Sequence, residues 1–164
     1  MDHLTKLEEM LDQANLEIKN GKYEVASDIL EKIIGIDPNF GKAYNHLAYL
    51  YEVKFKEYEK GETLYKLCLE KSPTYPAVYY NYAVLLSTLG KYDELKELLD
   101  KAITIPGITL ATMYNEYAIM YEQQGNLDEA IAHYKKCAMN TLDKNVLNRA
   151  KESIERCQLK REFL

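Results

Sequence analysis

A pattern of small and large apolar residues recurs four times along the chain at intervals of 34 or 35 residues. One recurring position holds a small residue, at Ala14, Ala48, Ala83 and Ala118. The position four residues before it holds a large apolar residue, at Met10, Tyr44, Tyr79 and Tyr114. A period of this length is typical of a solenoid whose repeating unit is a helix, a turn and a second helix. The sequence therefore predicts stacked helix pairs rather than a catalytic domain.

A second set of positions repeats with the same period and lies between the members of the first. Its large apolar members are Tyr23, Tyr58, Tyr92 and Leu127. Three residues after each of these stand Ala26, Gly61, Leu95 and Ala130. Two interleaved sets indicate two helices in each repeat. The expected repeats cover about residues 7–40, 41–75, 76–109 and 110–142.

Short segments separate the two helices of each expected repeat. We expect turns at Asn20–Lys22, Leu89–Lys91 and Gly125–Asn126, each of which contains a glycine. Glycine at such a position favours the end of a helix. In the second repeat the expected turn, Lys54–Glu57, has no glycine and is one residue longer. We therefore expect an altered angle between the two helices of that repeat.

The repeat pattern stops after Thr141, and residues 143–164 have the pattern of one longer amphipathic helix. Its apolar stripe contains Val146, Leu147, Ala150, Ile154 and Cys157. A solenoid needs a terminal element that is apolar on its inner side and polar on its outer side. We therefore predict that this segment is a capping helix, which covers the apolar end of the last repeat.

Composition and charge restrict the classes of partner. A chain of 164 residues with 47% hydrophobic content can build one continuous core if its repeats stack, so we expect a single domain. The net charge of -5 argues against nucleic-acid binding, which needs a surplus of basic residues. The N-terminal segment carries acids where a signal peptide would be apolar, and no apolar stretch approaches the ~20 residues that span a bilayer. We expect a cytoplasmic protein without a membrane partner.

The three cysteines do not form the pattern of a disulfide framework or a metal site. Cys68 and Cys137 occupy the repeat position that holds Ile33 and Ala102 in the other two copies. A free cysteine packs like a small hydrophobic residue. Cys157 has no partner by spacing, and there is no CxxC motif. We therefore expect all three to be unpaired and Cys68 and Cys137 to pack in the interior.

The chain shows no constellation of residues that would carry catalysis. His3, His46 and His133 fall in different expected helices. There is no HExxH, phosphate-binding loop or GxSxG motif. The acidic residues are scattered along helix faces, where such residues commonly pair with lysine one turn away. We therefore predict a protein that is not an enzyme and needs neither a cofactor nor a metal.

Several residues match a known family motif. In the first helix of two repeats, the bulky and small residues of the motif are present as Tyr44, Leu47, Ala48 and Tyr51, and as Tyr114, Tyr117, Ala118 and Tyr121. The motif of the second helix is present at Gly125–Ala130 with Tyr134, and at Gly21–Tyr23 with Ala26 and Pro38. On these residues the chain resembles the tetratricopeptide repeat family over nearly its whole length. The resemblance implies an all-α, right-handed helix-turn-helix solenoid of four repeats with a C-terminal capping helix. The missing tryptophan and Leu95 in an alanine position depart from the family pattern.

The family resemblance also implies a concave groove lined by the first helix of each repeat. Twelve of the fifteen tyrosines fall in packing positions, whereas Tyr49 and Tyr80 fall on the opposite, groove-lining face. The predicted peptide-binding residues are Asn15, Asn45, His46, Tyr49, Tyr80, Asn81, Val84, Asn115 and Ile119. The same spacing also places Leu11, Glu116 and Glu122 on this face. Asparagine can pair with a peptide backbone while tyrosine, valine and isoleucine bury its side chains.

The best-defined ligand mode of the family, a clamp for the carboxylates of chaperone tails, is not expected here. Its five positions in the first three repeats hold Leu11, Asn15, His46, Ala77 and Asn81, which provide no positive field. We predict a non-catalytic adaptor or scaffold that binds a protein or peptide ligand. The alternatives are a structural self-assembly module and a small secretion-type chaperone. An acidic first repeat and a basic C-terminal helix would attract only weakly in salt, so we expect a monomer or a weak oligomer.

Overall fold

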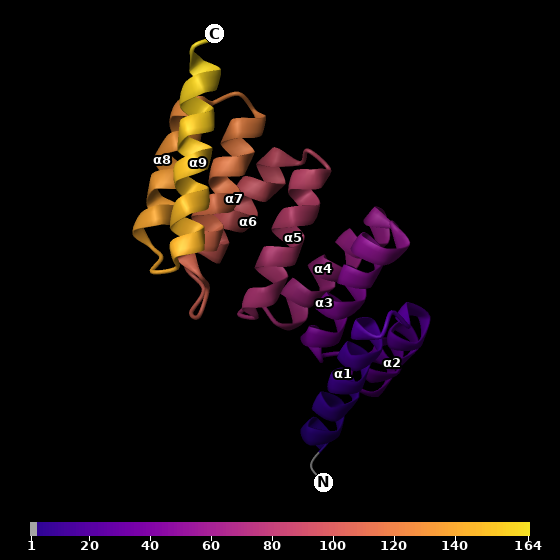
Figure 1. Cartoon of the computed structure of the whole chain (residues 1–164). Helices are drawn as coiled ribbons and strands as arrows, with labels where there is room; N and C mark the ends of the chain where they lie inside the picture. Colours follow the sequence, from indigo (N-terminus) through magenta and orange to yellow (C-terminus); the bar gives the residue numbers. More distant parts are fainter. Residues whose placement is uncertain (1–2) are drawn as a thin grey trace. The chain divides into compact units, whose positions relative to one another are not determined.

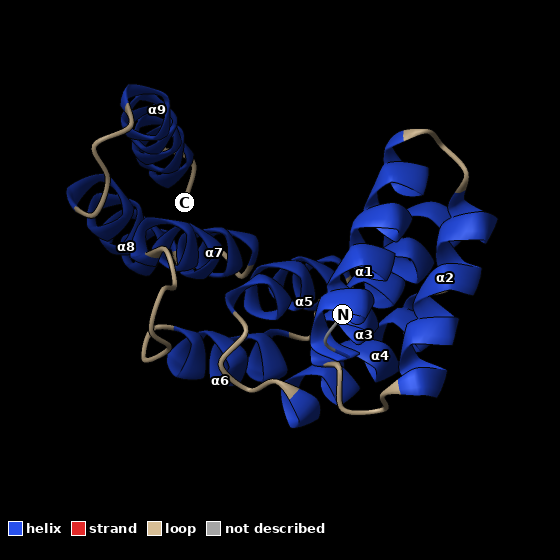
Figure 2. Ribbon diagram, turned by 90° about the horizontal axis from the view of Figure 1, so that it is seen from below, coloured by secondary structure: helices blue, strands red, loops and turns tan. Residues whose placement is uncertain are grey.

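The computed structural model describes residues 3–164, so Met1 and Asp2 of the N-terminal segment lie outside the described residues. Figures 1 and 2 show that this part of the chain consists of helices joined by short loops, without a strand. The helices are α1 (His3–Lys19), α2 (Tyr23–Ile36), α3 (Gly41–Tyr49), the π-helix η1 (Leu50–Phe55), α4 (Tyr58–Lys71), α5 (Pro76–Thr88), α6 (Tyr92–Ala102), α7 (Leu110–Gln123), α8 (Leu127–Met139) and α9 (Lys144–Arg161). The predicted all-α class is confirmed.

The chain divides into two compact units, Met1–Leu85 and Leu86–Leu164, with the division inside α5. In the first unit α1 packs on α2, α2 on α3, and α3 on α4. In the second unit α6 packs on α7, α7 on α8, and α8 on α9. Within residues 3–164, no helix combines the length and apolar character needed to cross a membrane.

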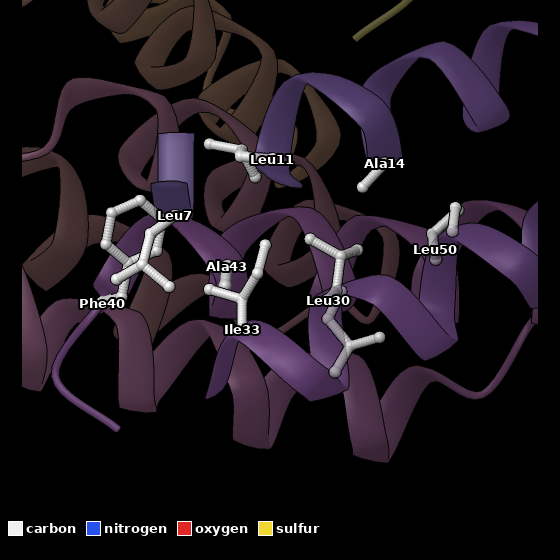
Figure 3. Close-up of a cluster of buried hydrophobic side chains, with 10 residues drawn as sticks. Leu7, Leu11, Ala14, Leu30, Ile33, Phe40, Ala43 and Leu50 are labelled. Carbon is white, nitrogen blue, oxygen red and sulfur yellow. The ribbon is translucent and has the colours of Figure 1, made fainter. Parts of the chain in front are cut away.

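The core of the first unit contains small residues from the recurring positions of the sequence pattern. Ala14 of α1 and Ala26 of α2 are both fully buried. Such small side chains allow two helices to approach closely, and larger side chains fill the space beside them. Figure 3 shows part of this cluster, whose buried members are Leu7, Leu11, Ala14, Ala26, Leu30, Ile33, Phe40, Ala43, Leu47 and Leu50. The placement of Leu11 on a groove face was wrong, because this side chain is only 5% exposed and lies in the core.

The extra residue of the second repeat is absorbed inside a helix. α3 continues directly into the π-helix η1, which includes Lys54 and Phe55. A π-turn takes one residue more than an α-turn, so it accommodates an insertion without breaking the helix. Lys56 ends the helix in the left-handed conformation, and the Glu57 N–H donates to the Tyr51 carbonyl at 2.8 Å. The expected four-residue turn was therefore wrong in its extent.

We expect Lys56→Gly to stabilise the chain by about 0.5–1 kcal/mol. Lys56 has φ 60°, and Gly21, Gly90 and Gly125 hold positive φ in the other three turns. A side chain is strained in this conformation, whereas glycine adopts it freely. Urea unfolding monitored by circular dichroism measures the difference. Lys56→Ala is the control, because it removes the charge but keeps the strain; equal effects of alanine and glycine would contradict the explanation.

The second unit contains the predicted C-terminal helix. The Asp143 carboxylate accepts a hydrogen bond from the Asn145 N–H at 2.7 Å and so caps the start of α9. Ala150 and Cys157 are buried against the neighbouring helices, and Val146 and Ile154 are partly buried. The assignment of Leu147 to the apolar stripe was wrong, since this residue is 38% exposed.

All three cysteines are buried and unpaired. Burial raises the pKa of the Cys68 thiol to about 12 and also raises the pKa values of Cys137 and Cys157. Cys157 packs with Leu127, Ile131 and Tyr134 in one cluster. The prediction that Cys68 and Cys137 pack in the interior is confirmed. Thiols with raised pKa values are mostly protonated at neutral pH, which makes them poor nucleophiles.

Candidate functional site

The predicted groove face of the first unit contains two hydrogen-bonded amides, of which one is buried. Asn45 of α3 is 3% exposed, and its side-chain oxygen accepts a hydrogen bond from the Asn81 amide of α5 at 3.2 Å. A buried amide must find partners within the protein, because burial removes it from water. The pair therefore connects α3 with α5, and Asn45 has little surface left for a ligand.

His46 is oriented by its own helix. Its Nδ1 lies 2.8 Å from the Lys42 carbonyl oxygen, and because a carbonyl only accepts, this nitrogen carries the proton. Burial lowers the pKa of His46, although the nearby backbone hydrogen bond opposes that shift. His46 is therefore mainly neutral at pH 7, with Nε2 as its remaining acceptor. It adds no positive charge to this face.

The other predicted residues of the first unit keep some of their surface. Asn15 of α1, Tyr49 at the end of α3 and Tyr80 and Asn81 of α5 are partly exposed. Val84 of α5 is 49% exposed. Aromatic side chains of intermediate exposure can present a ring to a ligand while their base stays packed. The grouping of these residues into one binding face remains a prediction.

The second unit contains a cavity of about 620 Å³ that includes the last two predicted residues, Asn115 and Ile119. α8 packs against both α7 and α9, and each of these three helices contributes lining side chains. Figure 2 shows α8 beside both of these helices. The lining residues are Thr109, Ala111, Thr112, Asn115, Ile119, Tyr134, Cys137, Thr141, Asp143, Val146, Arg149, Glu152, Ser153 and Arg156. The contribution of α9 was not predicted, because the sequence indicated only a cap.

Asn115 has a weak partner next to it in the chain. Its side-chain nitrogen lies 3.5 Å from the Glu116 carboxylate. Burial raises the pKa of Glu116, and this contact partly opposes the rise. A hydrogen bond of this length is near the limit of a real interaction. The Asn115 amide therefore has no strong side-chain partner within residues 3–164.

Glu122 of α7 anchors the C-terminal helix. Its carboxylate accepts two hydrogen bonds from Arg156, at 2.8 and 2.7 Å, and one from Lys160 at 2.7 Å. The Tyr134 hydroxyl donates a further bond at 2.8 Å. Hydrogen bonds from Arg156 and Lys160 hold the pKa of Glu122 far below its usual range. The sequence placed Glu122 on the groove face, but in the structure it fastens α9 to α7 and α8.

Most tyrosine side chains pack against neighbouring helices, as predicted. Six of the twelve assigned to packing positions are buried, namely Tyr44, Tyr65, Tyr79, Tyr82, Tyr117 and Tyr134, and the other six are partly buried. His133 is enclosed by three of the rings, with centroids 6.3 Å from Tyr114 and 5.1 Å from both Tyr117 and Tyr121. The His133 side chain is therefore packed among aromatic rings rather than displayed on the surface of the helix. Among residues 3–164, no group of His, Cys, Asp or Glu side chains could hold a metal ion.

The chain belongs to the tetratricopeptide repeat family, whose models match residues 10–40, 64–97 and 111–140. Similar solved structures include TTC0263, a thermophilic tetratricopeptide repeat (TPR) protein of Thermus thermophilus, with a TM-score of 0.74 and 19% identity over 90% of this chain and 81% of that one. They also include PilF of Pseudomonas aeruginosa, with a TM-score of 0.81 and 16% identity over 95% of this chain and 69% of that one.

A third similar structure is YrrB, described as a TPR protein with an unusual peptide-binding site, with a TM-score of 0.73 and 17% identity over 93% of this chain and 76% of that one. At these identities the likeness establishes the fold, which is a TPR solenoid. Comparison with proteins of curated function gives no match. Proteins of this family are in general interaction modules without catalytic activity.

Proposed function

We propose that this chain is a non-catalytic adaptor that binds an extended segment of a partner protein along the first helices of its repeats. The cavity beside α7 is the observation that supports this most strongly, because it contains the predicted residues Asn115 and Ile119. We further propose that residues 1–142 form the four repeats expected from the sequence and that residues 143–164 cap the last one. The peptide-binding site named for YrrB is consistent with this use of the fold.

The cavity has the chemistry that an extended peptide requires. Ile119, Ala111 and Val146 provide apolar surface for a side chain. Asn115, Thr112 and Ser153 provide donors and acceptors for a backbone. A volume of about 620 Å³ lies within the range of pockets that enclose ligands the size of a few residues. A segment entering this cavity would bury apolar groups while its amides remain hydrogen-bonded.

In the first unit we propose Tyr49 and Tyr80 as aromatic anchors for the ligand. Tyr49→Ala and Tyr80→Ala should each weaken partner binding by about 1–3 kcal/mol while leaving the melting temperature nearly unchanged. The partner is first captured from the native host on the immobilised chain and identified by mass spectrometry. Its binding segment is then titrated by isothermal calorimetry against each variant.

Tyr58→Ala is a matched control for this experiment. Tyr58 is also partly buried, but it lies in a packing position of α4. We expect this variant to unfold at a lower temperature and to bind the partner segment normally once folded. Large destabilisation by Tyr49→Ala and Tyr80→Ala, with unchanged affinity, would assign both tyrosines to the core and reject them as anchors.

Self-assembly is a second candidate function, favoured by exposed apolar side chains on α1. Leu4 is 54% exposed and Leu16 is 50% exposed, although both lie on a helix whose other leucines are buried. Light scattering at several protein concentrations separates the two functions. A mass that rises steeply with concentration and falls in the Leu16→Gln variant would support self-assembly instead of adaptor function.

A further inference from the structure

Charged residues of alternating sign line the cavity at the start of α9 and along it. In chain order they are Asp143, Arg149, Glu152 and Arg156. Two of them already have partners: Arg156 makes its paired hydrogen bonds to Glu122, and Asp143 accepts from the Asn145 N–H. The side chains of Arg149 and Glu152 form no hydrogen bond or ion pair within residues 3–164, although they are only one helical turn apart. This leaves one positive and one negative charge uncompensated on the same wall.

Arg149 lines the same cavity as Cys137. Its positive charge acts on the buried Cys137 thiol of α8 and lowers the pKa that burial raises. Arg149 itself is exposed. The apolar side chain of Ile119 belongs to the opposite wall, on α7. The α9 wall of the cavity thus carries charged side chains, whereas the α7 wall combines the apolar Ala111 and Ile119 with the polar Thr112 and Asn115.

We propose that this cavity selects an extended segment that carries an acidic, an aliphatic and a basic residue in one fixed order along the chain, with the acidic side chain at Arg149 and the basic one at Glu152. This inference rests on the proposed function and specifies its ligand. Residues two apart in an extended chain point to the same side and lie about 6.5–7 Å apart. Residues three apart on a helix are separated by about 4.5 Å along the axis, and their flexible side chains cover the difference. The intervening residue then faces Ile119.

The two charges act mainly on selectivity. An ion pair at an accessible site adds little affinity, but a ligand of the wrong sign loses the attraction and adds repulsion. A segment with two acids would be attracted by Arg149 and repelled by Glu152. A segment with two bases would be repelled by Arg149 and attracted by Glu152. Only a segment with both signs in the right order pairs with both. We expect this preference to weaken with added salt.

The probes are four fluorescein-labelled nonapeptides of glycine and serine with the central residues Asp-Val-Lys, Lys-Val-Asp, Asp-Val-Asp or Lys-Val-Lys. We expect one of the two mixed-charge peptides to bind about tenfold more tightly than the other three, as measured by fluorescence anisotropy. Chemical shifts of the backbone amides locate the bound peptide, which we expect to perturb Asn115, Ile119 and residues 146–156.

The decisive variant exchanges the two charges, in the double substitution Arg149→Glu and Glu152→Arg. We expect it to reverse the preference between Asp-Val-Lys and Lys-Val-Asp. Lys151 and Glu155 form an exposed ion pair on the same helix at 3.9 Å and do not line the cavity. Exchanging these two residues is the matched control and should leave the preference unchanged. Arg149→Gln, which keeps a polar side chain but removes the positive charge, should reduce the preference, because Glu152 alone then discriminates between the two peptides.

Two results would overturn the proposal and can be told apart. If the peptides bind in the cavity but the charge exchange leaves their order of affinity unchanged, the charged wall does not select the ligand, and the adaptor function stands. If none of the four peptides perturbs the cavity residues at any concentration, the cavity does not bind peptides. That result would contradict both this inference and the observation that most strongly supports the proposed function.

Discussion

Removal of residues 143–164 should cause the largest loss of stability of any change considered for this chain. α9 covers α8 through Cys157, which packs with Ile131 and Tyr134, and through Ala150, which packs in one cluster with Cys137. Each fully buried apolar side chain that becomes exposed costs about 1.5–3 kcal/mol. Several such side chains together cost about 5 kcal/mol or more, which approaches the whole stability of a small unit.

Size-exclusion chromatography with light scattering and thermal unfolding by circular dichroism test this prediction. We expect the shortened chain to aggregate, or to melt at a much lower temperature. Removal of Glu162–Leu164 alone is the control, because these residues are exposed and follow the end of α9. A chain ending at Leu142 that stays monomeric and equally stable would show that α9 is an appendage rather than a cap.

The helices could be predicted from the sequence because their determinants are local and periodic. Ala14, Ala48, Ala83 and Ala118 are each fully buried, as a close approach of helices requires. Glycines at three of the four turns marked the helix ends. The π-helix was missed for a related reason. The 35-residue spacing revealed the extra residue, but whether a loop or a helix absorbs it depends on packing around Tyr51 and Phe55.

The candidate site was harder to predict because its contacts join residues that are distant in sequence. Helical spacing put Asn45 on the groove face, but its burial depends on the amide of Asn81, 36 residues later. The same spacing could not show that Arg156, 34 residues after Glu122, would pair with it. The cavity itself needs α9 to lie beside α8, and the repeat pattern ends before α9 begins. Only the alternating charges of α9 could have indicated that this helix does more than cap.

Glu122→Ala should destabilise the attachment of α9 by about 2–3 kcal/mol. The Glu122 side chain is only 10% exposed, and its removal leaves Arg156 and the Tyr134 hydroxyl without their shared acceptor. Urea unfolding of the variant measures the loss. Lys160→Met is a useful comparison, since the Lys160 side chain is 51% exposed and should contribute under 1 kcal/mol. A double-mutant cycle with Arg156→Met then isolates the energy of the Glu122–Arg156 pair.

The contribution of Glu122 to the free energy of unfolding should also depend on pH in a defined direction. The folded-state pKa of Glu122 is lowered, first by the hydrogen bond from Arg156. A lowered pKa means that the stabilisation is fully present above the unfolded-state value of about 4.3 and is lost as the pH falls below it. Glu122→Gln keeps the shape but does not titrate. The stability difference between the wild-type chain and Glu122→Gln should therefore be constant from about pH 7 to 5.5 and shrink between about pH 4.5 and 3. A difference that stays constant down to pH 3 would show that the Glu122 charge does not hold α9 in place.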